Sequence, residues 1–209
     1  TFGATAFAVT YVGAKPVFLD AEGESWGLDP ELLRDVLKSK SDRGDRVAAI
    51  VPVDLFGRPA DYDRLLAVAA EFDVPVLVDA AESLGASHGD RVAGTMGHAG
   101  IYSFNGNKIM TTSGGGMLVS DDEQLVEKAR FWSAQSRESF PWYQHEEIGY
   151  NYRMSNILAA LGRAQLARLP EMIARRRAIR DLYTELLAEL EGVLITLDPP
   201  WGVGNSWLT

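Results

Sequence analysis

Short apolar runs alternate along the chain with stretches in which apolar residues recur at helical spacing. The runs that predict strands lie at 15–20, 47–53, 74–79, 99–103 and 115–120. The stretches that predict helices lie at 30–40, 61–72, 122–133, 155–168 and 171–190. Residues 134–150 are aromatic and polar without a clear period. We expect a long loop there, and a loop of that length in a compact domain is often functional.

The order of these elements predicts an α/β fold with a mainly parallel sheet and helices on both of its faces. One helix boundary is well marked, because Asp29 suits an N-cap and Pro30 suits the first helical position. In sheets of this kind, ligands bind beyond the carboxyl ends of the strands. The residues that follow the predicted strands are therefore the first candidates for function.

The composition excludes several classes of protein. The 209 residues include no cysteine, which rules out disulfides and thiolate metal sites and fits a reducing cytoplasm. A formal net charge of −9 argues against a nucleic-acid partner and against binding to an anionic membrane. No apolar run approaches the roughly 20 residues that span a bilayer. The chain opens on Thr1 in a segment typical of a domain interior, so we expect a fragment of a longer protein.

Three residues that follow predicted strands could carry chemistry. Asp79 ends an apolar run, where a carboxylate loses hydration unless it has a partner, although it could equally cap the next helix. Lys108 follows 99–103 in a polar stretch with glycines. An isolated lysine is most often a solvated surface residue, but one withheld from water can attack an aldehyde. Ser103 could donate to a phosphate or could simply close a turn.

Other patterns argue against common alternatives. Glycines 114–116 lack the spacing of a dinucleotide-binding motif and precede a strand, so we expect close backbone packing there. A nicotinamide-binding Rossmann domain needs a glycine fingerprint after its first strand, and this sequence has none. The three histidines are scattered, which predicts no metal site. Arg175, Arg176 and Arg177 suit the solvated face of a long helix.

Taken in order, several segments resemble the DegT/DnrJ/EryC1 family of sugar aminotransferases, which use pyridoxal 5′-phosphate (PLP). The matching segments are TF at 1–2, YVGAKPVFLD at 11–20, PVDLFG at 52–57, DAAES at 79–83, SFNGNK at 103–108, SGGGM at 113–117 and GYNYRMS at 149–155. The resemblance implies the fold of aspartate aminotransferase (fold type I). It also implies that residues 1–169 form the core of the PLP-binding large domain. Residues 170–209 would then form a linking helix and the start of a small C-terminal domain.

The resemblance assigns roles position by position. Lys108 matches the lysine that holds PLP as an imine, the internal aldimine, and later shuttles a proton. Asp79 matches the acid that pairs with the pyridine nitrogen. The other cofactor positions are Glu82 near the ring, Ser103 at the phosphate, Phe2 stacked on the ring, and Asn151, which reaches the phosphate in the neighbouring subunit. The substrate positions are Tyr150, Arg153 and Asn105.

The implied activity is transfer of an amino group, with glutamate as the expected donor, onto a nucleotide-linked keto-deoxy sugar. Dehydratases of the same family carry histidine where Lys108 stands, so the lysine favours transamination. The segment 103–109 looks like the branch that acts on UDP-linked 4-keto-6-deoxy-N-acetylhexosamines. A cytoplasmic homodimer with its active site at the interface is expected. The alternative is a non-catalytic relative that keeps the fold and the PLP pocket as a sensor or regulator.

Overall fold

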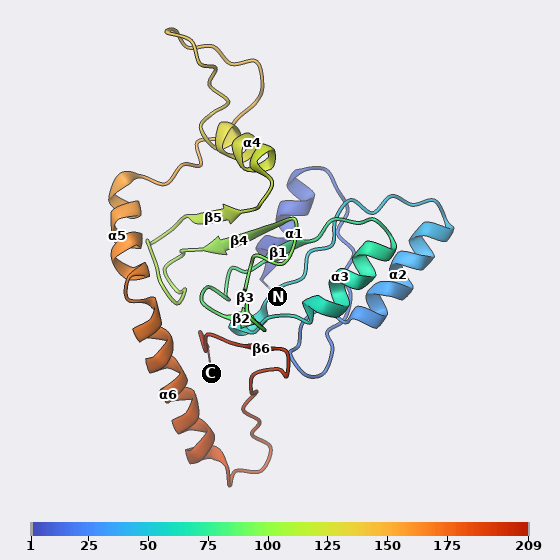
Figure 1. Ribbon diagram of the computed structural model, residues 1–209, viewed down its shortest axis with the longest axis vertical. Coiled ribbons are helices and arrows are strands. Elements are labelled where there is room, and N and C mark those ends of the chain that lie inside the picture. The colour runs from blue at the N-terminus through green and yellow to red at the C-terminus, as the bar shows by residue number, and fades with distance from the viewer. Residues whose placement is uncertain (1, 209) are drawn as a thin grey trace.

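The computed structural model of the protein describes residues 2–208 (Figure 1). Its helices are α1 (Gly3–Tyr11), α2 (Pro30–Asp42), the short 3-10 helix η1 (Leu55–Gly57), α3 (Tyr62–Glu71), α4 (Glu123–Ser133), α5 (Asn156–Leu166) and α6 (Leu169–Leu187). Its strands are β1 (Leu77–Asp79), β2 (Ser87–His88), β3 (Arg91–Val92), β4 (Ala99–Ser103), β5 (Gly116–Val119) and β6 (Gly202–Val203).

The main sheet is mixed and has the strand order β1-β4-β5. β1 and β4 run parallel, with Asp79 opposite Ile101, whereas β4 and β5 run antiparallel, with Ser103 opposite Gly116. A parallel crossover therefore joins β1 to β4, and the loop 104–115 joins β4 to β5. The sheet lies at the centre of the molecule, between α2 and α3 on one side and α5 and α6 on the other in the view of Figure 1.

Two of the predicted strands differ from the structure. Residues 15–20 form no strand, because Val17 and Phe18 are exposed and the segment has no neighbouring strand to bond. Residues 47–53 do lie parallel to β1, with Ile50 bridged to Val76 and Val53 bridged to Asp79. These residues form isolated bridges and not a continuous strand. Prolines 52 and 75 lie within the paired segments and have no N–H to donate to the hydrogen-bond ladder. The same interruption shortens β1 relative to the predicted run at 74–79.

One face of the sheet carries the main core. Val76, Val78 and Tyr102 pack there against buried apolar residues of α2 and α3, which include Leu33, Leu37, Leu65 and Val68. Side chains alternate between faces along a strand, so Asp79 points to the opposite face. That face carries α1, whose Thr5 hydroxyl donates to the Asp79 carboxylate at 2.6 Å. Packing on the core face thus holds the strands in place, and the Asp79 side chain lies on the opposite face, next to α1.

The predicted helices are confirmed where local signals mark their starts. Asp29 accepts hydrogen bonds from two N–H groups of the first turn of α2, and Asp122 does the same for α4. The expected loop at 134–150 contains no helix or strand, only one isolated bridge within it, Arg137 to His145, and one at its ends, Ala134 to Asn151, and it extends past α4 at the top of Figure 1. Helix α1 and the small antiparallel sheet β3-β2-β6 were not predicted. Their strands hold two residues each, which is too short for any periodicity to reveal.

A buried carboxylate ties the segments around the sheet together. Asp54, fully buried, accepts hydrogen bonds from the Tyr62 hydroxyl at 2.6 Å, the Ser83 hydroxyl at 2.6 Å and the Ala60 N–H at 3.1 Å. Its own N–H donates to the Asp79 carbonyl. Burial raises the pKa of the Asp54 carboxyl to about 6, although the three hydrogen bonds act to lower it.

We expect Asp54 to make stability fall as the pH rises through its pKa. Its ordinary pKa is 3.8 and its pKa in the folded protein is about 6, so between these values the folded state retains a proton that the unfolded state releases. The Asp54→Asn variant has no such proton. The free energy of unfolding of Asp54→Asn, relative to the original chain, should therefore rise by about 1–3 kcal/mol from pH 4 to pH 7.

Urea denaturation at several pH values measures this difference. Asp35→Asn, which removes an exposed carboxylate from α2, is the matched control and should follow the original chain at every pH. A pH-independent difference for Asp54→Asn would show that the Asp54 carboxyl does not titrate in this range.

Candidate active site

The candidate residues lie at one edge of the main sheet. β1 ends at Asp79 and its parallel neighbour β4 ends at Ser103, so both residues lie at the carboxyl edge. The turn after β1 carries Glu82, and the loop after β4 carries Lys108. The topology therefore brings together residues that lie far apart in the sequence, at the edge where such sheets bind ligands.

Both carboxylate oxygens of Asp79 are engaged. Oδ2 accepts the hydrogen bond from the Thr5 hydroxyl at 2.6 Å, and Oδ1 accepts one from the Ala81 N–H at 3.1 Å. The backbone of Asp79 is held as well, because its N–H donates to the Pro52 carbonyl. A carboxylate that is buried and bonded in this way has a fixed orientation. Phe2 directly precedes α1, the helix of Thr5, and its ring is exposed.

Lys108 and Glu82 form a largely buried ion pair. The Lys108 Nζ lies 3.6 Å from Glu82 Oε1, and the two side chains are only 13% and 11% exposed. The second oxygen of Glu82 accepts a hydrogen bond from the Phe56 N–H at 2.8 Å. Lysine at this depth is uncommon unless it is paired, so the carboxylate accounts for its position.

The loop that carries Lys108 is closed by its own backbone. The Lys108 N–H donates to the Asn105 carbonyl at 3.1 Å, and the Thr112 N–H donates to the Phe104 carbonyl at 2.9 Å. The Ser103 hydroxyl oxygen accepts a hydrogen bond from the Asn105 N–H at 3.3 Å. This leaves the Ser103 hydroxyl proton available for an anionic group at the end of β4. Ser103, Asn105 and Lys108 thus belong to one compact turn.

A tryptophan that the sequence did not indicate completes the surroundings of Lys108. The Lys108 Nζ lies 4.5 Å from the centroid of the Trp207 ring. The indole N–H of Trp207 donates a hydrogen bond to the Asn107 carbonyl at 2.7 Å. The sequence held no signal for this contact, because a tryptophan 100 residues beyond Asn107 has no spacing or motif that links it to the lysine.

The segment that delivers Trp207 is bonded to the turn that carries Glu82. The Asn205 side chain is fully buried and donates to the carbonyls of Glu82 at 2.7 Å and Leu84 at 3.0 Å. Two arginines of α6, expected on a solvated face, hold the same segment. Arg176 donates to the Trp207 carbonyl at 3.0 Å and Arg177 to the Gly204 carbonyl at 2.8 Å.

Tyr150, Asn151 and Arg153 lie apart from this cluster. Tyr150 and Asn151 are attached to the end of α4, where Asn151 bridges to Ala134 and the Tyr150 N–H donates to the Trp132 carbonyl. Tyr150 stacks on Tyr152 with ring centroids 5.0 Å apart, and all of these side chains are exposed. Within residues 2–208, no hydrogen bond or ion pair joins them to Lys108, Glu82 or Asp79.

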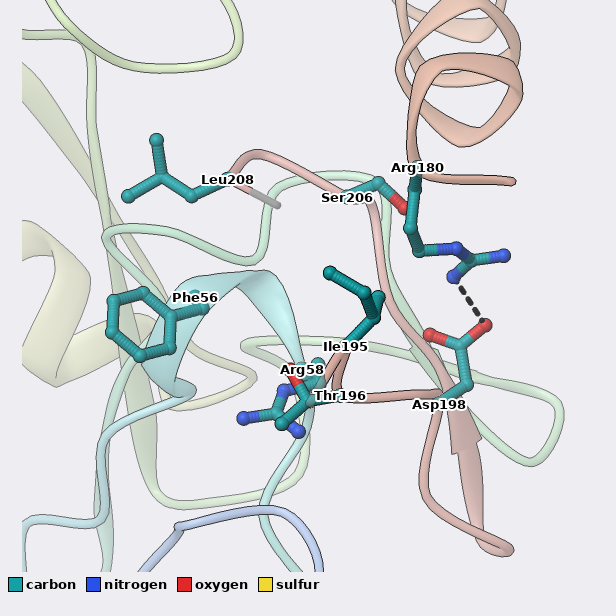
Figure 2. A pocket seen from close by; sticks show the side chains of 8 residues that line it. All are labelled: Phe56, Arg58, Arg180, Ile195, Thr196, Asp198, Ser206 and Leu208. Atoms are coloured by element: carbon teal, nitrogen blue, oxygen red, sulfur yellow. Dashed lines mark hydrogen bonds and ion pairs between the residues drawn. The ribbon is translucent and has the colours of Figure 1, made fainter. Parts of the chain in front are cut away.

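A small cavity lies near the surroundings of Lys108, where Phe56 and Ser206 form part of its wall (Figure 2). Its volume is about 30 Å³ and it is lined by Phe56, Arg58, Arg180, Ile195, Thr196, Asp198, Ser206 and Leu208. Arg58 is buried, and its Nε and Nη2 have no hydrogen-bond partner among the described residues, nor does the Ser206 hydroxyl. Burial lowers the pKa of the Arg58 guanidinium. The volume suits an ordered water bonded to these groups, and the cavity contains none of the predicted site residues.

The described part of the chain offers two further findings. Residues 2–208 contain no group of three or more metal-ligating side chains, and none of their helices is long and apolar enough to cross a membrane.

The residues at the sheet edge fit the chemistry of an aldehyde cofactor with a phosphate. Lys108 supplies an amine that is largely withheld from water, Asp79 supplies a fixed carboxylate, and Ser103 supplies a free hydroxyl proton. An amine for the aldehyde, an acid for a basic ring nitrogen and a donor for the phosphate are the three functions that PLP requires of its protein.

Comparison with known proteins agrees with this geometry. A family model described as the DegT/DnrJ/EryC1/StrS aminotransferase family matches residues 1–209. EpsN of Bacillus subtilis (strain 168), whose name provisionally describes a pyridoxal phosphate-dependent aminotransferase, is 47% identical over 209 residues, which is 100% of this chain and 54% of EpsN. GDP-perosamine synthase of Escherichia coli O157:H7 is 35% identical over 190 residues, which is 91% of this chain and 50% of the relative. The chain thus spans about half the length of these curated relatives.

The fold is also similar to solved structures. DesI, whose structure was determined in the presence of its TDP-sugar product, superposes with a TM-score of 0.87 at 34% identity, over 99% of this chain and 51% of DesI. The fold expected from the resemblance, an aspartate-aminotransferase-like α/β domain with a mixed sheet, is confirmed. The chain belongs to the DegT/DnrJ/EryC1/StrS aminotransferase family, whose members are PLP-dependent enzymes.

Proposed function

We propose that the protein containing this chain is a PLP-dependent aminotransferase that acts on a nucleotide-linked keto-deoxy sugar. The amino donor in this proposal is an amino acid, with glutamate expected. The observation that carries the proposal is the position of Lys108. Its amine is held beside Glu82, at the same sheet edge as the bonded carboxylate of Asp79.

Each residue at the edge has a distinct task in this proposal. PLP, when bound, supplies an electron sink for the bond changes at the amino carbon. Asp79 keeps the ring nitrogen protonated by charge pairing, and Thr5 and the Ala81 N–H keep that carboxylate oriented. Lys108 attaches the cofactor and, when free, moves a proton between the substrate carbon and the cofactor. Ser103 donates to the phosphate.

Three other assigned residues contribute binding. Phe2 precedes α1, and in this proposal its exposed ring stacks on the cofactor. Glu82 lies near the ring and holds the free amine of Lys108 through the 3.6 Å ion pair. Asn105 shares the turn of Ser103 and Lys108 and is available to the substrate.

The substrate class is supported by what the relatives act on. One relative is named for the synthesis of GDP-perosamine, and DesI was crystallised with a TDP-sugar product. Both names describe sugars linked to nucleotides. Within this class, the segment 103–109 favours a UDP-linked keto sugar as the substrate.

The assembly in the proposal is a cytoplasmic homodimer. In this proposal residues 1–169 form the core of the PLP-binding large domain, and residues 170–209 form a linking helix and the start of the small C-terminal domain. Tyr150, Asn151 and Arg153 are exposed and separate from the lysine cluster of their own chain. Residues in that position can serve the neighbouring subunit across a two-fold interface, with Asn151 at its cofactor phosphate.

Lys108→Ala should abolish covalent attachment of the cofactor. Borohydride reduction of the full-length protein with PLP, followed by peptide mapping, should find a pyridoxyl group on Lys108 and none in the variant. The rate of amino transfer should fall by at least about 10²–10⁴, because a positioned proton carrier is lost.

Lys40→Ala, which removes a lysine of α2, is the matched control and should trap the cofactor normally. If the full-length protein carries no PLP on Lys108, the enzyme proposal fails. If PLP is trapped on Lys108 but the bound cofactor undergoes no half-reaction with an amino acid or a keto sugar, the protein is the non-catalytic relative that acts as a sensor or regulator.

Complementation tests the role of Asn151. In a heterodimer of Lys108→Ala and Asn151→Ala subunits, one site would receive an intact lysine from one chain and an intact asparagine from the other. When half of the dimers are mixed, activity should return to about a quarter of the original value. Activity no higher than that of the two separate variants would mean that Asn151 does not serve the neighbouring site.

A further inference from the structure

We propose that Trp207 is a positioning residue for Lys108, and that its indole face and the Glu82 carboxylate together hold the free lysine amine at the sheet edge. The inference rests on the proposed function, since it concerns the lysine whenever the cofactor is not attached to it. It adds a residue, and a segment of the chain, to the site described above.

The contact has the geometry of a cation held against an aromatic face. The Lys108 Nζ lies 4.5 Å from the Trp207 ring centroid and 3.6 Å from Glu82 Oε1. Trp207 is only 5% exposed, and the lysine side chain is 13% exposed. The attraction between an ammonium group and an indole increases as water is excluded, so burial makes this contact stronger than a surface one.

The indole is fixed by bonds that do not involve the lysine. Its N–H donates to the Asn107 carbonyl at 2.7 Å, so the indole is bonded to the loop that carries Lys108. Its ring packs with Ile109, Leu169 and Ile173 in a small buried cluster. Because the ring is held from two sides, its face is already in place when the amine becomes free.

One amide side chain joins both partners of the lysine. Asn205 donates to the Glu82 carbonyl at 2.7 Å, and its Oδ1 accepts a hydrogen bond from the backbone N–H of Trp207 at 2.9 Å. Gly57 leaves room for it, since a Cβ at this position would clash with the Asn205 oxygen, and its φ of +79° favours glycine. The position of Trp207 relative to Glu82 is therefore set by Asn205.

Holding the amine matters because lysine is flexible. Its four-carbon side chain has considerable rotamer freedom when the amine is not attached to anything. An amine that must alternately attach to a cofactor and carry a proton works best when it stays within reach of both. Trp207 acts through position alone, because its indole N–H is already committed to the Asn107 carbonyl and its backbone N–H to Asn205 Oδ1.

The test is the reactivity of the Lys108 amine in the cofactor-free full-length protein. Competitive acetylation with isotope-labelled acetic anhydride and peptide mapping gives the rate at Lys108 relative to the exposed Lys15. Trp207→Leu removes the aromatic face that covers the amine, so the amine is less protected from the reagent and less restrained in position. Its relative rate should rise about two- to tenfold. Trp207→Phe keeps a ring face and should stay within about twofold of the original protein.

Trp201→Leu is the matched control. Trp201 is partly buried and its indole also donates to a carbonyl, that of Pro59, but it does not contact Lys108. This variant should leave the relative rate unchanged, and circular dichroism identifies any variant that fails to fold.

Three outcomes would overturn the inference. They are an unchanged rate in Trp207→Leu, equal rates in Trp207→Leu and Trp207→Phe, or an equal rise in Trp201→Leu. Because the measurement needs no cofactor, its failure is distinct from failure of borohydride trapping at Lys108, which alone bears on the proposed function.

Discussion

The site depends on one buried carboxylate that lies behind it. Asp54 accepts hydrogen bonds from the Tyr62 and Ser83 hydroxyls and from the Ala60 N–H, in a position without solvent contact. These bonds join the start of α3 to the turn after β1, which carries Glu82. A buried carboxylate is tolerated only when its oxygens are bonded, so a shift of these segments that kept Asp54 buried but broke its bonds would be costly. The position of the lysine's partner is thereby tied to the main core.

The second requirement is the docking of residues 204–207 onto that turn. Asn205 reaches the carbonyl of Glu82, and Trp207 reaches the lysine loop. The ion pair between Lys108 and Glu82 is thus enclosed by three segments: the turn after β1, the loop after β4 and residues 204–207. An enclosure of this kind excludes water and strengthens the electrostatic interactions inside it, which is what an amine nucleophile and proton carrier requires.

Much of this arrangement was predictable, and the exceptions have physical reasons. α2, α3 and α4 follow local signals, because a capping carboxylate and apolar spacing act within a few residues. The run at 15–20 was wrong as a strand, since strand formation depends on a partner that the run itself does not encode. The neighbourhood of Asp79, Glu82, Ser103 and Lys108 follows from motif order and strand topology. Trp207 was unpredictable, because its contact spans 100 residues without any motif.

The length of that contact has a consequence for synthesis. Trp207 leaves the ribosome about 100 residues after the lysine loop it bonds, and translation proceeds at roughly 5–20 residues per second. For about 5–20 seconds, the nascent chain therefore carries its reactive amine without the indole that covers it. During this interval no group from residues 204–207 restrains the amine, and the docking of that segment completes the surroundings of Lys108 last.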